Sequence, residues 1–408
     1  MQNAQIQSFS KLVLYIMLFW IFAVNNLHAE KSDTIRVPKN LVFAGYAQYG
    51  KVLATNPYLR QAYAPDDKTI EFGALSFQVL RQTDGDQLWE QKYGLPTYGI
   101  GIYSARFPDN KGFGTPIAFY GIFKAPFKRW NKFSLNYEAA FGFTFNWEPF
   151  NPSENNYNIS LGSTESVFID LGANVNYTLS PHFDLGLGYS FTHFSNGALK
   201  SPNFGLNTFS PKITLEYRIK RIPLNVSKRQ IPPFIRNTSV DFSIFGGEKN
   251  VLYKGNDVDT VRKYNGVYYP VYGFTTVVNR QVNYKSKLGI GMCLSYDGSY
   301  NSSVFVENGV PESKEAFQGN KLSLSVFPSY ELVINKLSVV IQPGFYVLRK
   351  HSTNKEPSTY QRLGLHYQLG SHLFAGVNLR AYNYHVSDFL EWTLGYQLAI
   401  SKKNSKYK

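Results

Sequence analysis

A histidine and a serine stand two residues apart in the segment His193-Phe194-Ser195-Asn196. Side chains at positions i and i+2 of a strand point to the same face, so the two would lie together in an extended backbone. Such a pair is the arrangement of a general base and a nucleophile, in which the imidazole takes the hydroxyl proton as the oxygen attacks a carbonyl carbon. The alternative interpretation is two polar residues at a strand end with no chemistry.

The segment that carries the pair, residues 182–195, alternates strictly. Its odd positions are apolar from Phe183 to Phe191, and its even positions are small or polar from Asp184 to Thr192. His193 and Ser195 continue the apolar odd face, and Asn207 occupies the same kind of position in the next alternating segment, 206–219. Polar groups on a lipid-facing surface are costly and usually functional. The three residues therefore form a candidate catalytic group.

The alternation is too long for an ordinary soluble sheet. In residues 132–147 the odd positions are all apolar, and the even positions are polar or small, over 16 residues. Strands of globular proteins are usually about 5–6 residues long, whereas a strand that crosses a membrane needs about 9–11. The pattern therefore predicts an all-β fold, an antiparallel transmembrane β-barrel.

Sixteen segments show this pattern, in two sets of eight. The first set comprises 41–54, 69–82, 97–105, 115–126, 132–147, 165–179, 182–195 and 206–219. The second comprises 238–248, 268–280, 284–297, 318–333, 335–348, 358–369, 371–382 and 387–400. Short turns such as Ser180-Pro181 and Asn335-Lys336 alternate with long loops such as 148–164 and 298–317, as in outer-membrane barrels.

A basic segment with three prolines, residues 220–237, separates the two sets. We expect one barrel of roughly 12–16 strands, because a single closed barrel is the usual way to leave no sheet edge in lipid. The alternative is an eight-stranded barrel followed by a second β module. The predicted division places the active-site strands in residues 30–226 and the further strands in 227–408.

The N-terminus has the pattern of a signal peptide. Lys11 precedes a run of 13 apolar residues, Leu12 to Val24, and a polar stretch ends in Ala29. The run is shorter than the roughly 20 residues of a membrane-spanning helix, so we expect residues 1–29 to be cleaved during export. An uncleaved N-terminal anchor is the alternative.

The composition suits an exported barrel. The single cysteine, Cys293, cannot form an internal disulfide, and the 30 Tyr and 32 Phe suit the aromatic girdles of membrane barrels. The net charge of +14 fits either scattered loop lysines and arginines or attraction to an anionic lipid surface such as the phosphates of lipopolysaccharide. Export argues against a nucleic-acid partner. No close pair of histidines has metal-ligand spacing, so a metal site is not expected.

The run His193-Phe194-Ser195-Asn196, followed by Pro202-Asn203 and Gly205, resembles the active-site strand and loop of the PagL-type lipid A 3-O-deacylases, within the acyloxyacyl hydrolase family of outer-membrane β-barrels. A looser resemblance covers about residues 41–220. The segment 388–392 is also similar to longer members of the family.

The resemblance implies an enzyme without cofactors that cleaves an ester-linked acyl chain from lipid A, the membrane anchor of lipopolysaccharide. By the same resemblance, Ser195 is the nucleophile and His193 the general base. Asn203 and the backbone near Gly197 and Ala198 would match the groups that stabilise the oxyanion.

The chain departs from the family at the acidic member of the triad, where it has Asn207. An amide oxygen can hold the imidazole tautomer, as in Cys-His-Asn sites, but it adds no negative charge. Glu165 is the competing candidate. It is the first residue of the preceding alternating segment, 165–179, and shares the apolar face of His193. We expect Asn207 to be the orienting residue.

Three functions remain open from the sequence. The first is a serine esterase acting on lipid A, with an acyl-chain groove formed by Leu187, Tyr189 and Phe191 on the face below His193. The second is a porin-like or structural barrel with a degenerate motif. A phospholipase barrel shares the chemistry but not the substrate. The even-face residues Arg362, His366, Arg380 and Glu391 suit either a packed lumen or a pore.

Overall fold

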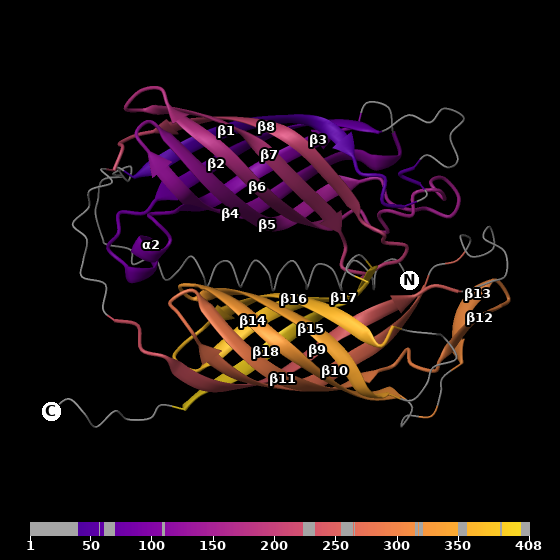
Figure 1. Cartoon of the computed structure of the whole chain (residues 1–408). Helices are drawn as coiled ribbons and strands as arrows, with labels where there is room; N and C mark the ends of the chain where they lie inside the picture. Colours follow the sequence, from indigo (N-terminus) through magenta and orange to yellow (C-terminus); the bar gives the residue numbers. More distant parts are fainter. Residues whose placement is uncertain are drawn as a thin grey trace, which may run out of the picture. The chain divides into compact units, whose positions relative to one another are not determined.

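The computed structural model describes residues 40–56, 58–60, 70–107, 111–222, 233–253, 264, 266–314, 317, 321–349, 357–383 and 386–400. The expected signal peptide, residues 1–29, lies outside the described residues. The described chain is almost entirely β-sheet (Figure 1). None of its helices has the length and apolar character needed to cross a membrane.

The first eight strands close into one antiparallel barrel in chain order. They are β1 (Leu41–Val52), β2 (Glu71–Gln82), β3 (Thr97–Arg106), β4 (Gly114–Trp130), β5 (Phe133–Trp147), β6 (Ser166–Thr178), β7 (Phe183–Ser195) and β8 (Leu206–Arg218). The short helix α2 (Leu88–Lys92) follows β2, and the 3-10 turn η1 (Lys111–Phe113) precedes β4. Because β1 pairs with both β2 and β8, the sheet has no open edge.

Eight further strands close into a second antiparallel barrel. They are β9 (Asn237–Val251), β10 (Val267–Gln281), β11 (Ser286–Asp297), β14 (Leu322–Ile334), β15 (Leu337–Arg349), β16 (Thr359–Gln368), β17 (Leu373–Tyr382) and β18 (Val386–Ile400). Closure occurs where β18 pairs with β9. A separate hairpin, β12 (Ser303–Glu307) and β13 (Val310–Lys314), lies in the connection from β11 to β14.

The expectation of a single barrel of 12–16 strands is therefore wrong, and the alternative of an eight-stranded barrel followed by a second β module is confirmed. The pairing of β8 with β1 completes the first sheet before the second begins. In the sequence, residues 220–237 separate the strands of the first barrel from those of the second. Their three prolines have no N–H to donate to a strand ladder.

All sixteen expected strands are present with shifts of a few residues at their ends. The hairpin β12–β13 was missed, because residues 298–317 were interpreted as a loop. Its turn contains Asn308 and Gly309, both with positive φ (50° and 79°). Asn-Gly is a strong sequence signal for such a tight hairpin turn, so the sequence did contain the information.

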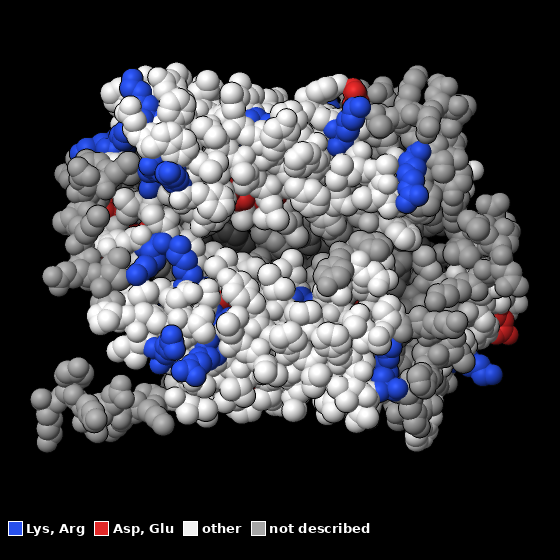
Figure 2. Space-filling view, viewed as in Figure 1, with Lys and Arg blue, Asp and Glu red and all other residues white. Residues whose placement is uncertain are grey.

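The alternation places apolar side chains on the outside of both barrels. Leu75 on β2 is 68% exposed and Ile290 on β11 is 74% exposed, whereas polar residues of the same strands, such as Ser76 and Ser295, are buried. On the face shown in Figure 2, the described surface is largely uncharged between Lys and Arg side chains that gather toward the barrel ends. Apolar exteriors and polar interiors are the pattern of barrels that lipid surrounds.

Charged residues pair with one another across the first lumen, beside a cavity of about 480 Å³. Lys124 is ion-paired with Glu216, and Lys212 is ion-paired with Glu138. Asp170 lies 3.7 Å from the Lys212 ammonium and accepts a hydrogen bond from Thr192. All five charged side chains are almost fully buried, so each needs its partners to offset the lost hydration.

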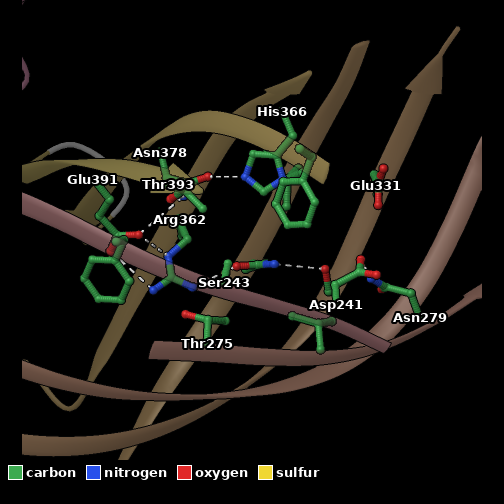
Figure 3. A pocket seen from close by; sticks show the side chains of 16 residues that line it. Asp241, Ser243, Thr275, Asn279, Glu331, Arg362, His366, Asn378, Glu391 and Thr393 are labelled. Atoms are coloured by element: carbon green, nitrogen blue, oxygen red, sulfur yellow. Dashed lines mark hydrogen bonds and ion pairs between the residues drawn. The ribbon is translucent and has the colours of Figure 1, made fainter. Parts of the chain in front are cut away.

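The second lumen is packed around Glu391. Its carboxylate lies 2.9 Å from Nε of Arg362 and 2.6 Å from a guanidinium nitrogen of Arg380. Figure 3 shows Arg362 beside Glu391, and His366 pointing to Asn378, whose Oδ1 lies 2.9 Å from Nε2 of the histidine. The cavity between these groups is about 30 Å³. This volume holds about one water molecule, which favours the packed-lumen interpretation over a solute-conducting pore.

A β-bulge explains how the segment 388–392 contributes two acids to this lumen. The register between β17 and β18 shifts so that Arg380 is opposite Phe389 and Ala381 is opposite Ser387, which leaves Asp388 as the extra residue. Asp388 and Glu391 are three positions apart, yet both are buried. Asp388 binds the Lys249 ammonium at 2.7 Å, and Glu391 binds the two arginines.

The second barrel should depend on Glu391. Changing Glu391→Gln leaves two buried guanidiniums without a countercharge, so we expect a loss of about 3–5 kcal/mol in folding stability. The measurement is the midpoint of unfolding by heat-dependent gel mobility. The exposed hairpin residue Glu307 is the matched control, and Glu307→Gln should leave the midpoint unchanged. Equal midpoints for the wild type and Glu391→Gln would contradict this account.

Candidate active site

The pairing of β7 with β8 brings the candidate residues together. His193 on β7 is directly opposite Asn207 on β8. His193 and Ser195 belong by alternation to the same face of β7 as Leu187 and Tyr189, which are 59% and 55% exposed, although Ser195 itself is only 3% exposed. The expected common face is therefore present, and the cross-strand register adds Asn207 to it.

The three side chains form a continuous hydrogen-bonded chain. Nδ1 of His193 lies 2.6 Å from Oδ1 of Asn207, and Nε2 lies 2.9 Å from Oγ of Ser195. An amide oxygen only accepts hydrogen bonds, so Nδ1 is the protonated nitrogen and donates to Asn207. Nε2 then carries a lone pair and accepts the Ser195 hydroxyl proton. This is the tautomer that a general base needs.

Phe194 fixes the end of the strand that carries this chain. It stands between His193 and Ser195, points into the barrel and is fully buried. Its ring packs edge-on against Trp147 with centroids 5.0 Å apart, and it lies 5.7 Å from Phe168. Aromatic packing of this kind holds the backbone in place, so the two outward-facing residues are displayed from a rigid support.

The loop after β7 contains free hydrogen-bond donors. Gly197 and Ala198 both have positive φ (64° and 62°) in a tight turn that the Leu199 N–H closes onto the Asn196 carbonyl at 3.2 Å. Oδ1 of Asn203 accepts the N–H of Asn196 at 3.1 Å. Among the described residues, nothing accepts a hydrogen bond from the buried Nδ2 of Asn203. An unused buried donor is costly unless it serves a ligand or reacting group.

Glu165 is not brought to the histidine. The β6–β7 register places Ile169 opposite His193 and Val167 opposite Ser195. Glu165 is four residues before Ile169, which corresponds to about 13 Å along a strand. Its backbone carbonyl accepts a hydrogen bond from Ser163 at 2.7 Å. Asn207, and not Glu165, contacts the imidazole.

The three residues expected to form the acyl-chain groove lie in a column below His193 on the outward face of β7. Tyr189 stacks on Phe209 of β8 with centroids 5.3 Å apart. Leu187 is opposite Val175 on β6 and Ile213 on β8. The surface next to the polar group is therefore continuously apolar over three strands, as contact with an acyl chain requires.

The 196–205 loop is held by contacts that the sequence does not predict. The N–H groups of Phe204 and Gly205 donate to the carbonyls of Ile159 and Ser160 at 3.1 and 2.9 Å. Nδ2 of Asn196 donates to Oγ of Ser163 at 3.0 Å. These contacts join two loops that are far apart in the chain, and no local sequence pattern indicates them. In the described part of the chain, no group of three His, Cys, Asp or Glu residues could hold a metal ion.

Two family models match the chain. The model for lipid A 3-O-deacylase (PagL) matches residues 74–216, and the model for the C-terminal domain of acyloxyacyl hydrolase matches residues 238–402. Together they cover well over half of the chain, and each falls within one of the two barrels.

Solved structures show more distant likeness. The outer membrane enzyme PagL is 17% identical, with 43% of this chain and 97% of that chain covered and a TM-score of 0.27. The siderophore receptor PirA from Acinetobacter baumannii is 8% identical, with coverages of 90% and 69% and a TM-score of 0.25. The toluene transporter TodX from Pseudomonas putida is 8% identical, with 89% of both chains covered and a TM-score of 0.18. No curated protein matches the chain.

His193 and Ser195, which carry the resemblance, are thus in hydrogen-bonded contact, and Asn207 contacts the histidine. They lie on the barrel whose sequence matches the lipid A 3-O-deacylase model. The second barrel accounts for the other match. The chain belongs to the PagL-type acyloxyacyl hydrolase family of outer-membrane β-barrel proteins.

Proposed function

We propose that the protein is an outer-membrane serine esterase that removes an ester-linked acyl chain from lipid A. The observation that supports this most is the chain of hydrogen bonds from Asn207 through His193 to Ser195 on the outward face of the first barrel. The family match supports the substrate class. Export would use residues 1–29 as a cleaved signal peptide.

In the first step, Oγ of Ser195 attacks the ester carbonyl carbon while its proton moves to Nε2 of His193. The negative charge that develops on the carbonyl oxygen is stabilised by Nδ2 of Asn203 and by the backbone N–H groups of Gly197 and Ala198. None of these three donors has a hydrogen-bond acceptor among the described residues. The tetrahedral species collapses, the bond to the sugar oxygen breaks, and His193 returns the proton to that oxygen.

In the second step, water attacks the acyl-enzyme carbonyl and gives a proton to Nε2 of His193. The bond between the acyl carbon and Oγ of Ser195 breaks, the serine oxygen recovers the proton, and a free fatty acid leaves. Asn207 keeps the imidazole in one tautomer throughout. Because an amide has no charge, it stabilises the imidazolium less than a carboxylate would.

The outward position of the site explains how a barrel whose lumen is crossed by buried ion pairs could act on a lipid. The ester of a membrane lipid reaches Ser195 by lateral diffusion, with its acyl chain along the apolar column of Leu187, Tyr189 and Phe191. The substrate does not have to enter the lumen, which the ion pairs around Lys124 and Lys212 occupy.

The nucleophile and the base are tested by substitution. Ser195→Ala and His193→Ala should each lower deacylation by at least about a thousandfold, because each removes a bond-making or proton-transferring group. The measurement is mass spectrometry of lipid A from cells that produce each variant, with heat-dependent gel mobility as the folding check. Ser153→Ala, at an exposed loop serine, is the control. Near-normal activity of either variant would reject the assignment.

The orienting residue is tested at Asn207. Asn207→Ala should lower the rate by about a hundredfold to ten-thousandfold, because the imidazole loses the partner that holds its tautomer. Asn207→Glu should retain or raise the rate, because a carboxylate accepts the same hydrogen bond and adds charge. Rates are measured on purified enzyme with lipid A in detergent. A silent Asn207→Ala together with an inactive Glu165→Gln would assign the role to Glu165 instead.

The acyl-chain surface is tested at Leu187 and Tyr189. Leu187→Ala and Tyr189→Ala should change the preferred chain length more than they change stability, because they remove apolar contact with the acyl chain. Competition between lipid A species with different acyl chains gives the preference by mass spectrometry. Phe119→Ala, at a 57% exposed outward residue on β4, is the control. The same product profile for all variants would place the acyl chain elsewhere.

A further inference from the structure

Asn56, in the loop between β1 and β2, is buried where three loops meet. It is 1% exposed. Its Nδ2 donates to Oγ of Ser160 at 3.0 Å and lies 3.5 Å from the carbonyl oxygen of Gly205, while its Oδ1 accepts the N–H of Leu59 at 3.0 Å. One amide side chain thus joins the β1–β2 loop, the β5–β6 loop and the loop that follows the candidate nucleophile.

The backbone that Asn56 holds lies against the imidazole of His193. A Cβ atom added to Gly205 would be 3.0 Å from Cε1 of His193, so the glycine packs tightly on the edge of the ring. Gly205 has a φ of +73°, a conformation that other residues rarely adopt. The position of Gly205 therefore limits where the ring can lie, and Ser160 and Asn56 fix that position from outside.

The same β1–β2 loop also holds the other neighbour of the histidine. The N–H of Leu53 donates to the backbone carbonyl of Asn207 at 2.8 Å. Asn207 contacts Nδ1, and Gly205 contacts the ring edge. Two supports of the imidazole are thus attached to one loop, through Leu53 and through Asn56.

We propose that Asn56 is a positioning residue for His193, acting through Ser160 and Gly205; this inference rests on the proposed function of the site. The amide side chain suits the task because it donates and accepts at the same time. An aspartate has the same shape and can still accept from the Leu59 N–H and from the Ser160 hydroxyl. An ionised carboxylate cannot donate to the Gly205 carbonyl, and it repels that oxygen. The donor therefore carries the positioning effect.

Three variants test the proposal: Asn56→Asp, Ser160→Ala and the double variant. Each single change should lower kcat about tenfold to a hundredfold, because a small misplacement of a catalytic base is enough for a loss of this size. KM should change less than about twofold, since no substrate contact is removed. The double variant should lose less than the product of the two single losses, because both residues act on the position of Gly205. The assay uses p-nitrophenyl decanoate and the full-length protein in detergent micelles.

The matched control is Asn151→Asp in the β5–β6 loop, where the side chain makes a 3.3 Å hydrogen bond to the exposed Glu154. It should leave kcat unchanged. If Asn56→Asp loses the heat-dependent mobility of the folded barrel, the milder Ser160→Ala decides. An unchanged kcat in Ser160→Ala would overturn the proposal. A fall in kcat that follows the fall in the unfolding midpoint from variant to variant would also overturn it, because the effect would then be a loss of stability.

A second readout is independent of catalysis. In protein labelled with ¹⁵N-histidine, the imidazole signals of His193 are assigned by their loss in His193→Gln. Asn56→Asp and Ser160→Ala should shift these signals and leave those of His366 and His372 in the second barrel unchanged. A shift in protein that shows no Ser195-dependent activity would reject the proposed function and keep the positioning contact. Ser195-dependent activity with no shift of the His193 signals would keep the proposed function and reject the positioning role of Asn56.

Discussion

Every backbone polar group within a bilayer must find its partner inside the protein, and the rest of this structure depends on that constraint. Helices or closed sheets satisfy it, and this chain uses closed sheets. Closure is achieved twice, when β8 returns to β1 and when β18 returns to β9. Once the backbone is satisfied in this way, the side chains divide into an apolar outside and a polar inside, and each barrel must then neutralise the charges that it encloses.

The two lumens solve the charge problem with different residues. The first pairs lysines with acids, through Lys124 and Lys212. The second places one carboxylate, Glu391, between two arginines. Buried ion pairs of this kind add little net stability compared with an apolar core, but removing one member leaves an uncompensated charge. We infer that the lumens act as rigid interiors that support the outer surface.

The candidate site shows why a polar group can persist on an apolar outer face. Ser195, His193 and Asn207 satisfy one another by hydrogen bonds, so the energetic cost of their position is small compared with that of isolated polar side chains. Two sets of contacts hold these side chains in position. Phe194 fixes the strand from inside the barrel, and the network of Asn56, Ser160 and Gly205 fixes the loop that borders the ring.

The sequence by itself determined the strands, their two faces and the shared face of His193 and Ser195. These follow from the two-residue period of an extended chain, which is a local property. The tertiary structure decided what depends on pairing between distant segments. Three features depend on such pairing: the closure into two barrels, the contact of His193 with Asn207 and not with Glu165, and the contacts of Asn56. Asn56 meets Ser160 and Gly205 across 104 and 149 residues of sequence, and no local period encodes such a register.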